Sequence, residues 1–371
     1  MNSQYFFFLG HTPALSTLEL NSLLPTPAAL ISESIASYNG ELDPASFGPK
    51  LGGTRKIAKL LEICSPRDTV SHLTALIAAG LTKNVAITDY ADLNLTHSDL
   101  TQIKKQAAQS RPIRLVSLDT TEHELVMLAH QHVTEYNLVP SPEGIIIAET
   151  VLIYDAEDWI VRDRAKPYRD IKRGMLPPKL ARILVNLGTL GKTGLTVYDP
   201  FCGTGTILAE ALLSNCGVLG SDNNPAAISG SQANLAWLSQ TYSITPSPNY
   251  SVALADVTHP PFPSADLIVT EPYMGPLVEG RNVPPVSKLK DLARGLDKLY
   301  RGAFRAWHPL LPAKGRVVIT IPSFHSGNFD ISTISVDTIS ALGYNFIASV
   351  PYGKPGSTVV RNITILEKLA N

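Results

Sequence analysis

A short loop between a predicted strand and a predicted helix constrains this chain most. The loop is DPFCGTG, residues 199–205; it follows the apolar run Leu195–Tyr198 and precedes a helix that begins at Thr206. Gly203 and Gly205 let the backbone turn tightly and approach a ligand, and the helix N-terminus offers free N–H groups to a carboxylate. A turn that merely needs glycine would look similar. The preceding acid and the strand–loop–helix order favour a ligand-binding loop, because ligands bind at the carboxyl ends of strands in such sheets.

From this strand onward, apolar runs alternate with segments of helical periodicity. Strands are predicted at 195–198, 218–221, 251–255, 267–270 and 316–321, and helices at 206–214, 225–238, 287–308 and 333–342. This alternation indicates a mostly parallel, doubly wound sheet. Two final strands, 346–351 and 358–367, follow each other without a helix between them, which indicates an antiparallel insertion at the sheet edge.

Acidic residues follow the first four strands. After the second, Asp222 is placed to bind a ribose hydroxyl pair, although an isolated Asp there would more often cap a helix. After the third, Asp256 is either a turn residue or an acceptor for an adenine amino group. After the fourth, in EPYMGP, the Glu271 carboxylate and the Pro272 carbonyl could accept both protons of an exocyclic amine, and Tyr273 could stack on the base. The alternative there is a proline turn with a buried tyrosine.

Composition and charge narrow the classes of protein. Of 371 residues, 44% are apolar and 17% are charged, which suits two or three packed domains, and no apolar run approaches the roughly 20 residues of a membrane span. The three cysteines show neither paired metal spacing nor a disulfide framework, so we expect no metal site and a reducing cytoplasm. Residues 1–165 hold 12 Lys and Arg against 19 Asp and Glu, whereas residues 166–371 hold 19 against 13. A polyanionic partner would therefore meet the second half more readily.

The motifs together resemble one enzyme family. The chain resembles class I, amino-directed methyltransferases in DPFCGTG, in EPYMG and in the positions of Asp222 and Asp256. More closely, RDIKRGMLPPKLARILVNL with DPFCGTG resembles the tRNA guanosine N2-methyltransferases that act at position 10 in archaea and eukaryotes. Near the start, FFFLGHTPALSTLELNSLL and LGGTRKIAKLL resemble the ferredoxin-like domain of these enzymes and its passage into a THUMP domain, which is an RNA-binding module.

The resemblance implies a fold and a domain order. The fold is α/β: a Rossmann-like class I methyltransferase domain with a seven-stranded doubly wound sheet, preceded by ferredoxin-like and THUMP α+β modules. The expected domains are 1–60 (ferredoxin-like), 61–160 (THUMP-like), 161–184 (linker and first helix) and 185–371 (methyltransferase). Within 61–160 the residue pattern predicts helices at 70–79, 98–109 and 122–136 and strands at 85–88, 113–117 and 144–154.

The resemblance also implies a cofactor, S-adenosyl-L-methionine, and the residues that bind it. Residues 174–176 would close over the methionine end, residues 199–206 would cradle the methionine, Asp222 would bind the ribose and Asp256 the adenine. The implied cofactor-binding residues are Gly174, Met175, Leu176, Asp199, Cys202, Gly203, Gly205, Thr206, Asp222, Asn223, Asp256 and Val257. The implied catalytic residues are Glu271, Pro272 and Tyr273. The family usually shows Asp-Pro-Pro-Tyr where this chain has Glu-Pro-Tyr-Met, so the acid is one methylene longer and the aromatic residue comes one position earlier.

Two basic segments are candidates for contact with RNA. One is the connector at 162–174, and the other is the predicted helix at 287–308, whose cations recur at spacings of three or four on one side. Such a row is usually a solvated helix face, but it could also track a phosphate backbone. The candidate RNA-binding residues are Arg169, Lys172, Arg173, Lys290, Arg294 and Lys298.

The expected function is methylation of the exocyclic N2 amine of a guanosine in tRNA at position 10, in the cytoplasm and away from membranes. Two alternatives stay open. One is an amino-methyltransferase for DNA or ribosomal RNA, although the loop at 277–287 is too short to be the target-recognition region of a DNA enzyme. The other is an RNA-binding protein of the same fold with weakened catalysis, suggested by the altered Glu-Pro-Tyr motif. The oligomeric state also stays open, with a monomer favoured.

Overall fold

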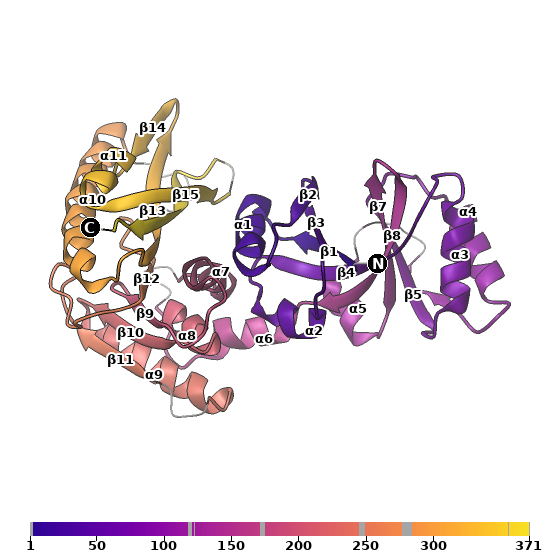
Figure 1. Cartoon of the computed structure of the whole chain (residues 1–371), viewed down its shortest axis with the longest axis horizontal. Coiled ribbons are helices and arrows are strands. Elements are labelled where there is room, and N and C mark those ends of the chain that lie inside the picture. Colours follow the sequence, from indigo (N-terminus) through magenta and orange to yellow (C-terminus); the bar gives the residue numbers. More distant parts are fainter. Residues whose placement is uncertain are drawn as a thin grey trace. The chain divides into compact units, whose positions relative to one another are not determined.

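The chain divides into two compact units. The computed structural model describes residues 3–117, 121, 123–170, 175–244, 249–276, 284–354 and 356–370. One unit comprises Met1–Ala156 and the other Glu157–Asn371 (Figure 1). The division between the units therefore lies four residues before the end expected for the second module, and we describe each unit by itself.

The first unit contains a mixed sheet with helices. In its described part, eight strands follow the order β2-β3-β1-β4-β8-β7-β5-β6. The strands are β1 (Gln4–Leu9), β2 (Ala29–Ser32), β3 (Ile35–Asn39), β4 (Thr54–Cys64), β5 (Asn84–Asp89), β6 (Arg114–Leu115), β7 (Thr134–Ser141) and β8 (Gly144–Ile153). The helices are α1 (Pro13–Leu23), α2 (Pro44–Phe47), α3 (Thr69–Ala79), α4 (His97–Ala107) and α5 (Leu125–His130).

Strand β4 joins the two halves of this sheet. It pairs antiparallel with β1 on one side and with β8 on the other, so the boundary expected between residues 60 and 61 lies inside a strand. The helix expected at 122–136 is wrong in its second part, because α5 ends at His130 and β7 begins at Thr134. Strand β7 lies between β8 and β5 and is buried on both faces, so its sequence lacks the alternation of a half-exposed strand.

A buried ion pair fastens β4 to β7. The Lys56 ammonium lies 2.7 and 2.8 Å from the two carboxylate oxygens of Glu135 and donates to Asn137 Oδ1 at 2.8 Å. Burial by itself would raise the pKa of Glu135, but the charge of Lys56 and the hydrogen bonds from Lys56, Thr150 and Thr88 outweigh it, so the pKa of Glu135 is lowered. The charge of each partner is therefore balanced within the unit.

The second unit carries the doubly wound sheet expected from the sequence. Its described strands follow the order β11-β10-β9-β12-β13-β16-β15, and β14 pairs with β13 beside this path. The strands are β9 (Thr196–Asp199), β10 (Gly217–Asp222), β11 (Tyr250–Leu254), β12 (Leu267–Thr270), β13 (Arg316–Ser326), β14 (Phe329–Ser332), β15 (Tyr344–Tyr352) and β16 (Val359–Lys368). The helices are α6 (Ala156–Ile160), α7 (Pro178–Thr189), α8 (Thr206–Leu213), α9 (Pro225–Thr241), α10 (Val286–Trp307) and α11 (Val336–Ala341), with a π-turn at Val161–Ala165.

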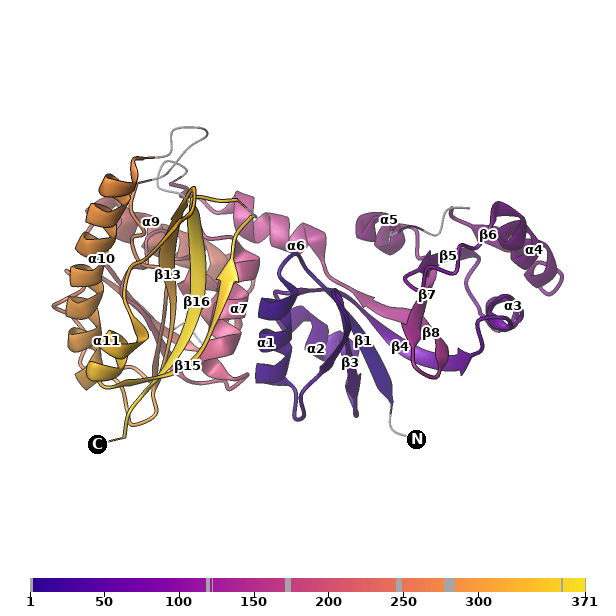
Figure 2. The same cartoon turned by 90° about the horizontal axis from the view of Figure 1, so that it is seen from above.

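The pairing within this sheet fixes where the ends of its strands meet. Strands β9 to β13 pair in parallel, whereas β16 runs antiparallel to both β13 and β15. The antiparallel insertion is thus β16, one strand in from the edge strand β15. Helices α7 and α10 lie on opposite faces of the sheet (Figure 2). The apolar side of α10, including Leu296, Tyr300 and Trp307, packs in one core with β12 and β13.

Candidate active site

The loop after β9 depends on two glycines with positive φ. Gly203 has φ +49° and Gly205 has φ +81°, a region that other L-residues rarely adopt. The Gly205 N–H donates to the Cys202 carbonyl at 2.7 Å, and the Cys202 N–H donates to the Ser221 carbonyl at 3.0 Å. A Cβ on Gly205 would lie 2.5 Å from Ser231 Oγ of α9. The tight turn at the N-terminus of α8 is therefore built into the fold, and the loop is fastened to β10.

Asp199 ends β9 and is buried. Its Oδ1 accepts hydrogen bonds from Thr270 Oγ1 at 2.6 Å and from the Phe201 N–H at 3.1 Å. Burial raises the pKa of Asp199 to about 7; these two hydrogen bonds oppose the shift, and the charges of Asp222 and Glu271 add to it. Among the described residues no cation forms an ion pair with Asp199, so its charge is left unbalanced.

Asp222 and Asp256 follow the next two strands, as expected, but their surroundings differ. Asp222 accepts from the Gly203 N–H at 3.1 Å and from the Asn224 N–H at 2.9 Å, so it stabilises the glycine loop. Asp256 is mostly exposed and accepts from the Thr258 N–H at 2.8 Å. Hydrogen bonds from the Thr258 side chain and backbone lower the pKa of Asp256. Without a ligand, both acids are engaged with their own turns.

The other residues expected to bind the cofactor lie around these acids. Cys202, Leu176 and Val257 are buried, Asn223 is exposed, and Met175 and Thr206 are half-buried. Burial raises the pKa of the Cys202 thiol, which makes it an apolar wall of the loop. Gly174, Lys172 and Arg173 lie outside the described residues.

Glu271, Pro272 and Tyr273 follow β12 at the same edge of the sheet. Glu271 Oε1 accepts from Arg361 Nε at 2.7 Å, and the Glu271 side chain is 16% exposed. Tyr273 is 56% exposed, which rules out the alternative of a buried tyrosine in a proline turn. Its backbone carbonyl accepts from the buried Tyr300 hydroxyl at 2.8 Å, so α10 holds this loop in place.

Arg361 is a residue of this site that the sequence pattern did not reveal. It belongs to β16, where it lies opposite Pro322 of β13 and Tyr352 of β15. The signal in the sequence was a lone arginine within the apolar segment VVRNITIL. Its proximity to Glu271 follows from the insertion of β16 beside β13, which brings the beginning of β16 to the carboxyl end of β12.

The connector before α7 packs behind the glycine loop. Asn234 of α9 donates to the Thr204 carbonyl at 2.8 Å and to the Tyr168 carbonyl at 3.0 Å, and it accepts from the Tyr168 N–H at 2.9 Å. Lys166 Nζ donates to Thr206 Oγ1 at 3.2 Å. Asn234 was not expected to matter, and Lys166 lies in the connector expected to contact RNA but is buried; both couple the connector to the loop. Arg169 in the same connector is exposed.

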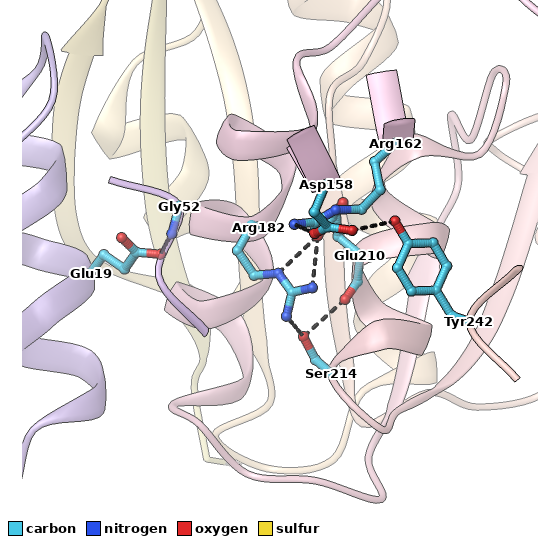
Figure 3. Close-up of polar contacts among 8 residues, drawn as sticks. All are labelled: Glu19, Gly52, Asp158, Arg162, Arg182, Glu210, Ser214 and Tyr242. Carbon is cyan, nitrogen blue, oxygen red and sulfur yellow. Dashed lines mark hydrogen bonds and ion pairs between the residues drawn. The ribbon is translucent and has the colours of Figure 1, made fainter. Parts of the chain in front are cut away.

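A buried ion network fastens α8 to α7 and to the π-turn (Figure 3). Glu210 Oε2 accepts from Arg162 Nη1 and from Arg182 Nε, each at 2.8 Å. Arg162 also pairs with Asp158 at 2.6 Å, and Arg182 donates to Ser214 Oγ at 2.7 Å. Because Glu210 lies one turn along the helix that begins at the glycine loop, this network fixes the direction of the helix N-terminus.

The basic residues of α10 lie on its solvent side. Lys290 and Arg294 line a groove, and Lys298 is exposed outside the groove lining. In the described ranges no helix is long and apolar enough to cross a membrane. The same ranges contain no group of three or more His, Cys, Asp or Glu side chains that could hold a metal ion.

Comparison with known proteins finds a family model that matches within the second unit and relatives that match part of the chain. Residues 166–324 match the family model of the RMKL-like methyltransferase domain. A relative in Methanothermobacter thermautotrophicus is 32% identical over 152 residues, which are 41% of this chain and 40% of the relative. A relative in Pyrococcus abyssi is 28% identical over 193 residues, which are 52% of this chain and 50% of the relative. Both relatives are named tRNA (guanine(10)-N2)-dimethyltransferase, and the chain spans about half of their length or less.

A solved structure with a similar fold covers almost the whole chain. The crystal structure of TrmN from Thermus thermophilus has a TM-score of 0.58 and 17% sequence identity and covers 99% of this chain and 100% of that chain. At this identity the likeness shows the fold. Together with the methyltransferase-domain match over residues 166–324, it confirms the Rossmann-like class I methyltransferase fold expected for the second unit. The assignment of residues 61–160 as a THUMP module remains a prediction. The comparisons confirm the resemblance seen in the sequence: residues 166–324 match a methyltransferase-domain family model, and part of the chain is similar to relatives named tRNA (guanine(10)-N2)-dimethyltransferase.

Proposed function

We propose that this protein transfers a methyl group from S-adenosyl-L-methionine to the exocyclic N2 amine of a guanosine in tRNA, at position 10. The observation that carries the proposal is the row of acids after neighbouring strands, ending in a Glu271 carboxylate that Arg361 holds beside the exposed Tyr273. The names and similarity of the curated relatives support the choice of amine and of RNA.

The residues around Asp199 fit a cationic cofactor. Asp199 is buried, its pKa is raised to about 7, and no cation lies beside it among the described residues. A positively charged ligand would therefore stabilise it as the anion. When bound, S-adenosyl-L-methionine supplies an electrophilic methyl group. Asp222 would accept from ribose hydroxyls, and the exposed Asp256 from an adenine amino group. Gly203 and Gly205 let the backbone approach the methionine part closely.

Glu271 would orient the target amine. Arg361 engages Oε1, while Oε2 has no hydrogen-bond partner among the described residues and is left for the substrate. That oxygen and the Pro272 carbonyl would accept the two amine protons, and the nitrogen lone pair would then face the methyl donor. Positive charge develops on the nitrogen as the new bond forms, and a fixed carboxylate stabilises that charge. Tyr273 is exposed at the mouth and would stack on the flipped guanine.

The charge of the two units suggests how tRNA is held. The first unit has 10 Lys and Arg against 16 Asp and Glu, whereas the second has 21 against 16. The second unit would therefore supply most of the electrostatic attraction, through the connector residues Arg169, Lys172 and Arg173 and the solvent side of α10. The first unit would contribute shape and position, as RNA contacts to grooves and ends do.

Mass spectrometry of nucleosides tests this function. The full chain is incubated with unmodified tRNA transcripts and S-adenosyl-L-methionine carrying a deuterated methyl group, with the Glu271→Ala variant as control. We expect labelled N2-methylguanosine or N2,N2-dimethylguanosine in transcripts with guanosine at position 10 and neither when that base is adenosine. Label in another nucleoside, or only in ribosomal RNA or DNA, would refute the proposal. Binding of both cofactor and tRNA without any label would instead support an RNA-binding protein with weakened catalysis.

A further inference from the structure

A groove of about 510 Å³ lies between α10 and the segment that leads from β14 to α11. Its size falls within the roughly 300–1,000 Å³ of pockets that hold small ligands. One wall is charged and the other is largely hydroxylic. The lining residues from α10 are Lys290, Ala293, Arg294, Asp297 and Arg301, and residues 331–335 form the other wall.

Helix α10, which forms one wall of this groove, also contacts the loop of the candidate active site. It contacts the loop after β12 through Tyr300, which donates to the Tyr273 carbonyl, and through Leu292, whose Cδ2 would lie 2.7 Å from a Cβ on Gly275. Strand β12 ends at Thr270, opposite Ile319 of β13. Strand β13 continues past this point and pairs with β14 over residues 323–326 (Figure 1). The β13–β14 hairpin therefore extends beyond the edge of the sheet at which Glu271 lies.

The edge of the groove combines a cation with an exposed aromatic ring. Lys290 Nζ lies 5.7 Å from the centroid of the Phe329 ring, and Phe329 is 53% exposed. Arg301 is paired with Asp297, and Arg294 with Asp291, whereas Lys290 forms no ion pair among the described residues. Lys290 is thus free to meet an anion beside a ring that can stack on a base.

We infer that this groove binds a single-stranded segment of the RNA next to the target base, with Phe329 stacked on a base and Lys290 on a phosphate. The inference rests on the proposed function for its choice of RNA. Flipping the target guanosine out of its stack removes one stacking partner from each adjacent nucleotide. An aromatic platform beside a cation is how proteins bind such nucleotides without reading their sequence. The hydroxyl-bearing wall formed by Ser332, Thr333 and Ser335 suits the polar backbone of the nucleic acid.

Two variants of the full chain and one matched control test this groove. Phe329→Ala should weaken binding of a short single-stranded oligoribonucleotide by about tenfold, since stacking on one base is worth roughly 1–3 kcal/mol. Phe329→Trp keeps a stacking surface and should retain binding. Lys290→Glu should weaken binding and lower the dependence on salt by about one phosphate contact. The control is Lys288→Glu, which makes the same charge change on an exposed residue of α10 outside the groove lining.

The readouts separate this inference from the proposed function. With tRNA as substrate, Phe329→Ala and Lys290→Glu should raise KM and leave kcat and cofactor affinity near wild type. The inference is overturned if both variants bind the oligoribonucleotide as the Lys288→Glu control does. If the wild type methylates no tRNA but the two variants still lose oligoribonucleotide binding, the proposed function fails and the groove stands.

Discussion

Two buried carboxylates, one in each unit, differ in whether a cation balances their charge. Glu135 is 0% exposed and Asp199 is 2% exposed, so both are withdrawn from water. Glu135 meets the Lys56 ammonium at 2.7 Å, and its pKa is lowered. Asp199 receives only hydrogen bonds from neutral groups, stands near two further carboxylates, and has a pKa raised to about 7.

The difference in charge balance suggests a structural role for Glu135 and a ligand-binding role for Asp199. The Glu135 cluster lies within strands and balances its own charge, so it holds β4 to β7 and has no need of a ligand. Asp199 lies at the carboxyl end of β9, where ligands of such sheets bind, and its charge is unbalanced in the chain alone. A buried acid with a raised pKa in that position is a candidate functional group, which agrees with the proposed site for a cationic cofactor.

The largest effect on stability is expected when the buried Lys56–Glu135 ion pair is broken. Glu135→Ala leaves the Lys56 ammonium buried without its carboxylate partner and should lower the free energy of unfolding of the first unit by about 3–5 kcal/mol. Thermal and denaturant unfolding followed by circular dichroism would measure it. Replacing both partners, as Lys56→Met with Glu135→Leu, should recover part of the loss. A single variant as stable as the wild type would remove the contrast between the two carboxylates.

Glu271 should matter for turnover and not for the cofactor. Glu271→Ala removes the fixed carboxylate from the target amine and should lower kcat for tRNA by about 100-fold, close to the effect of removing one preorganised group at a reaction centre. Glu271→Gln keeps an acceptor oxygen without the charge and should lose less. Calorimetry should find cofactor affinity unchanged in both. Wild-type turnover in Glu271→Ala would exclude this residue from the mechanism.

Arg361 should act through Glu271, as a positioning residue. Arg361→Ala releases the Glu271 carboxylate and should lower kcat by about tenfold, or roughly 1.4 kcal/mol, with little change in KM for tRNA. Arg361→Lys keeps the charge and should restore part of the rate. A loss that appears entirely in KM, or a fall in cofactor affinity of the same size, would show that Arg361 serves another role.

Asp222 should contribute to the affinity for the cofactor. Asp222→Ala removes the proposed ribose acceptor and a hydrogen-bond partner of the Gly203 N–H, so it should weaken S-adenosyl-L-methionine binding by at least tenfold, or roughly 1.4 kcal/mol. The effect should be seen by calorimetry in the absence of RNA. Unchanged affinity would place the ribose elsewhere.

The strand ends of the second unit could be predicted because their signal is local. Apolar runs followed by an acid are sufficient to identify Asp199, Asp222, Asp256 and Glu271. Strand β7 could not be predicted in this way, because both of its faces are buried and Glu135 and Asn137 look like surface positions until Lys56 supplies their partner. The short strands β3 and β14 were also missed.

The contact of Arg361 with Glu271 could not be predicted from local sequence patterns. Arg361 reaches Glu271 from a strand 90 residues later in the chain, and only the insertion of β16 between β13 and β15 brings the two together. The Lys290–Phe329 pair depends in the same way on a hairpin that extends past the end of β12. Contacts of this kind follow from register between distant strands, which no run of residues displays.

The most direct test of the central claim is the number of protons released when S-adenosyl-L-methionine binds at pH 7. With a pKa of about 7, Asp199 carries its proton in roughly half of the free molecules. A cationic ligand favours the carboxylate and lowers this pKa, so binding should release up to about half a proton, and less as the pH rises above 7. Calorimetry in two buffers of different ionisation enthalpy measures that release. We expect Asp199→Asn to abolish most of this release and Asp222→Asn to retain it. Equal release by the wild type and Asp199→Asn would contradict the claim that Asp199 is held for a cationic cofactor.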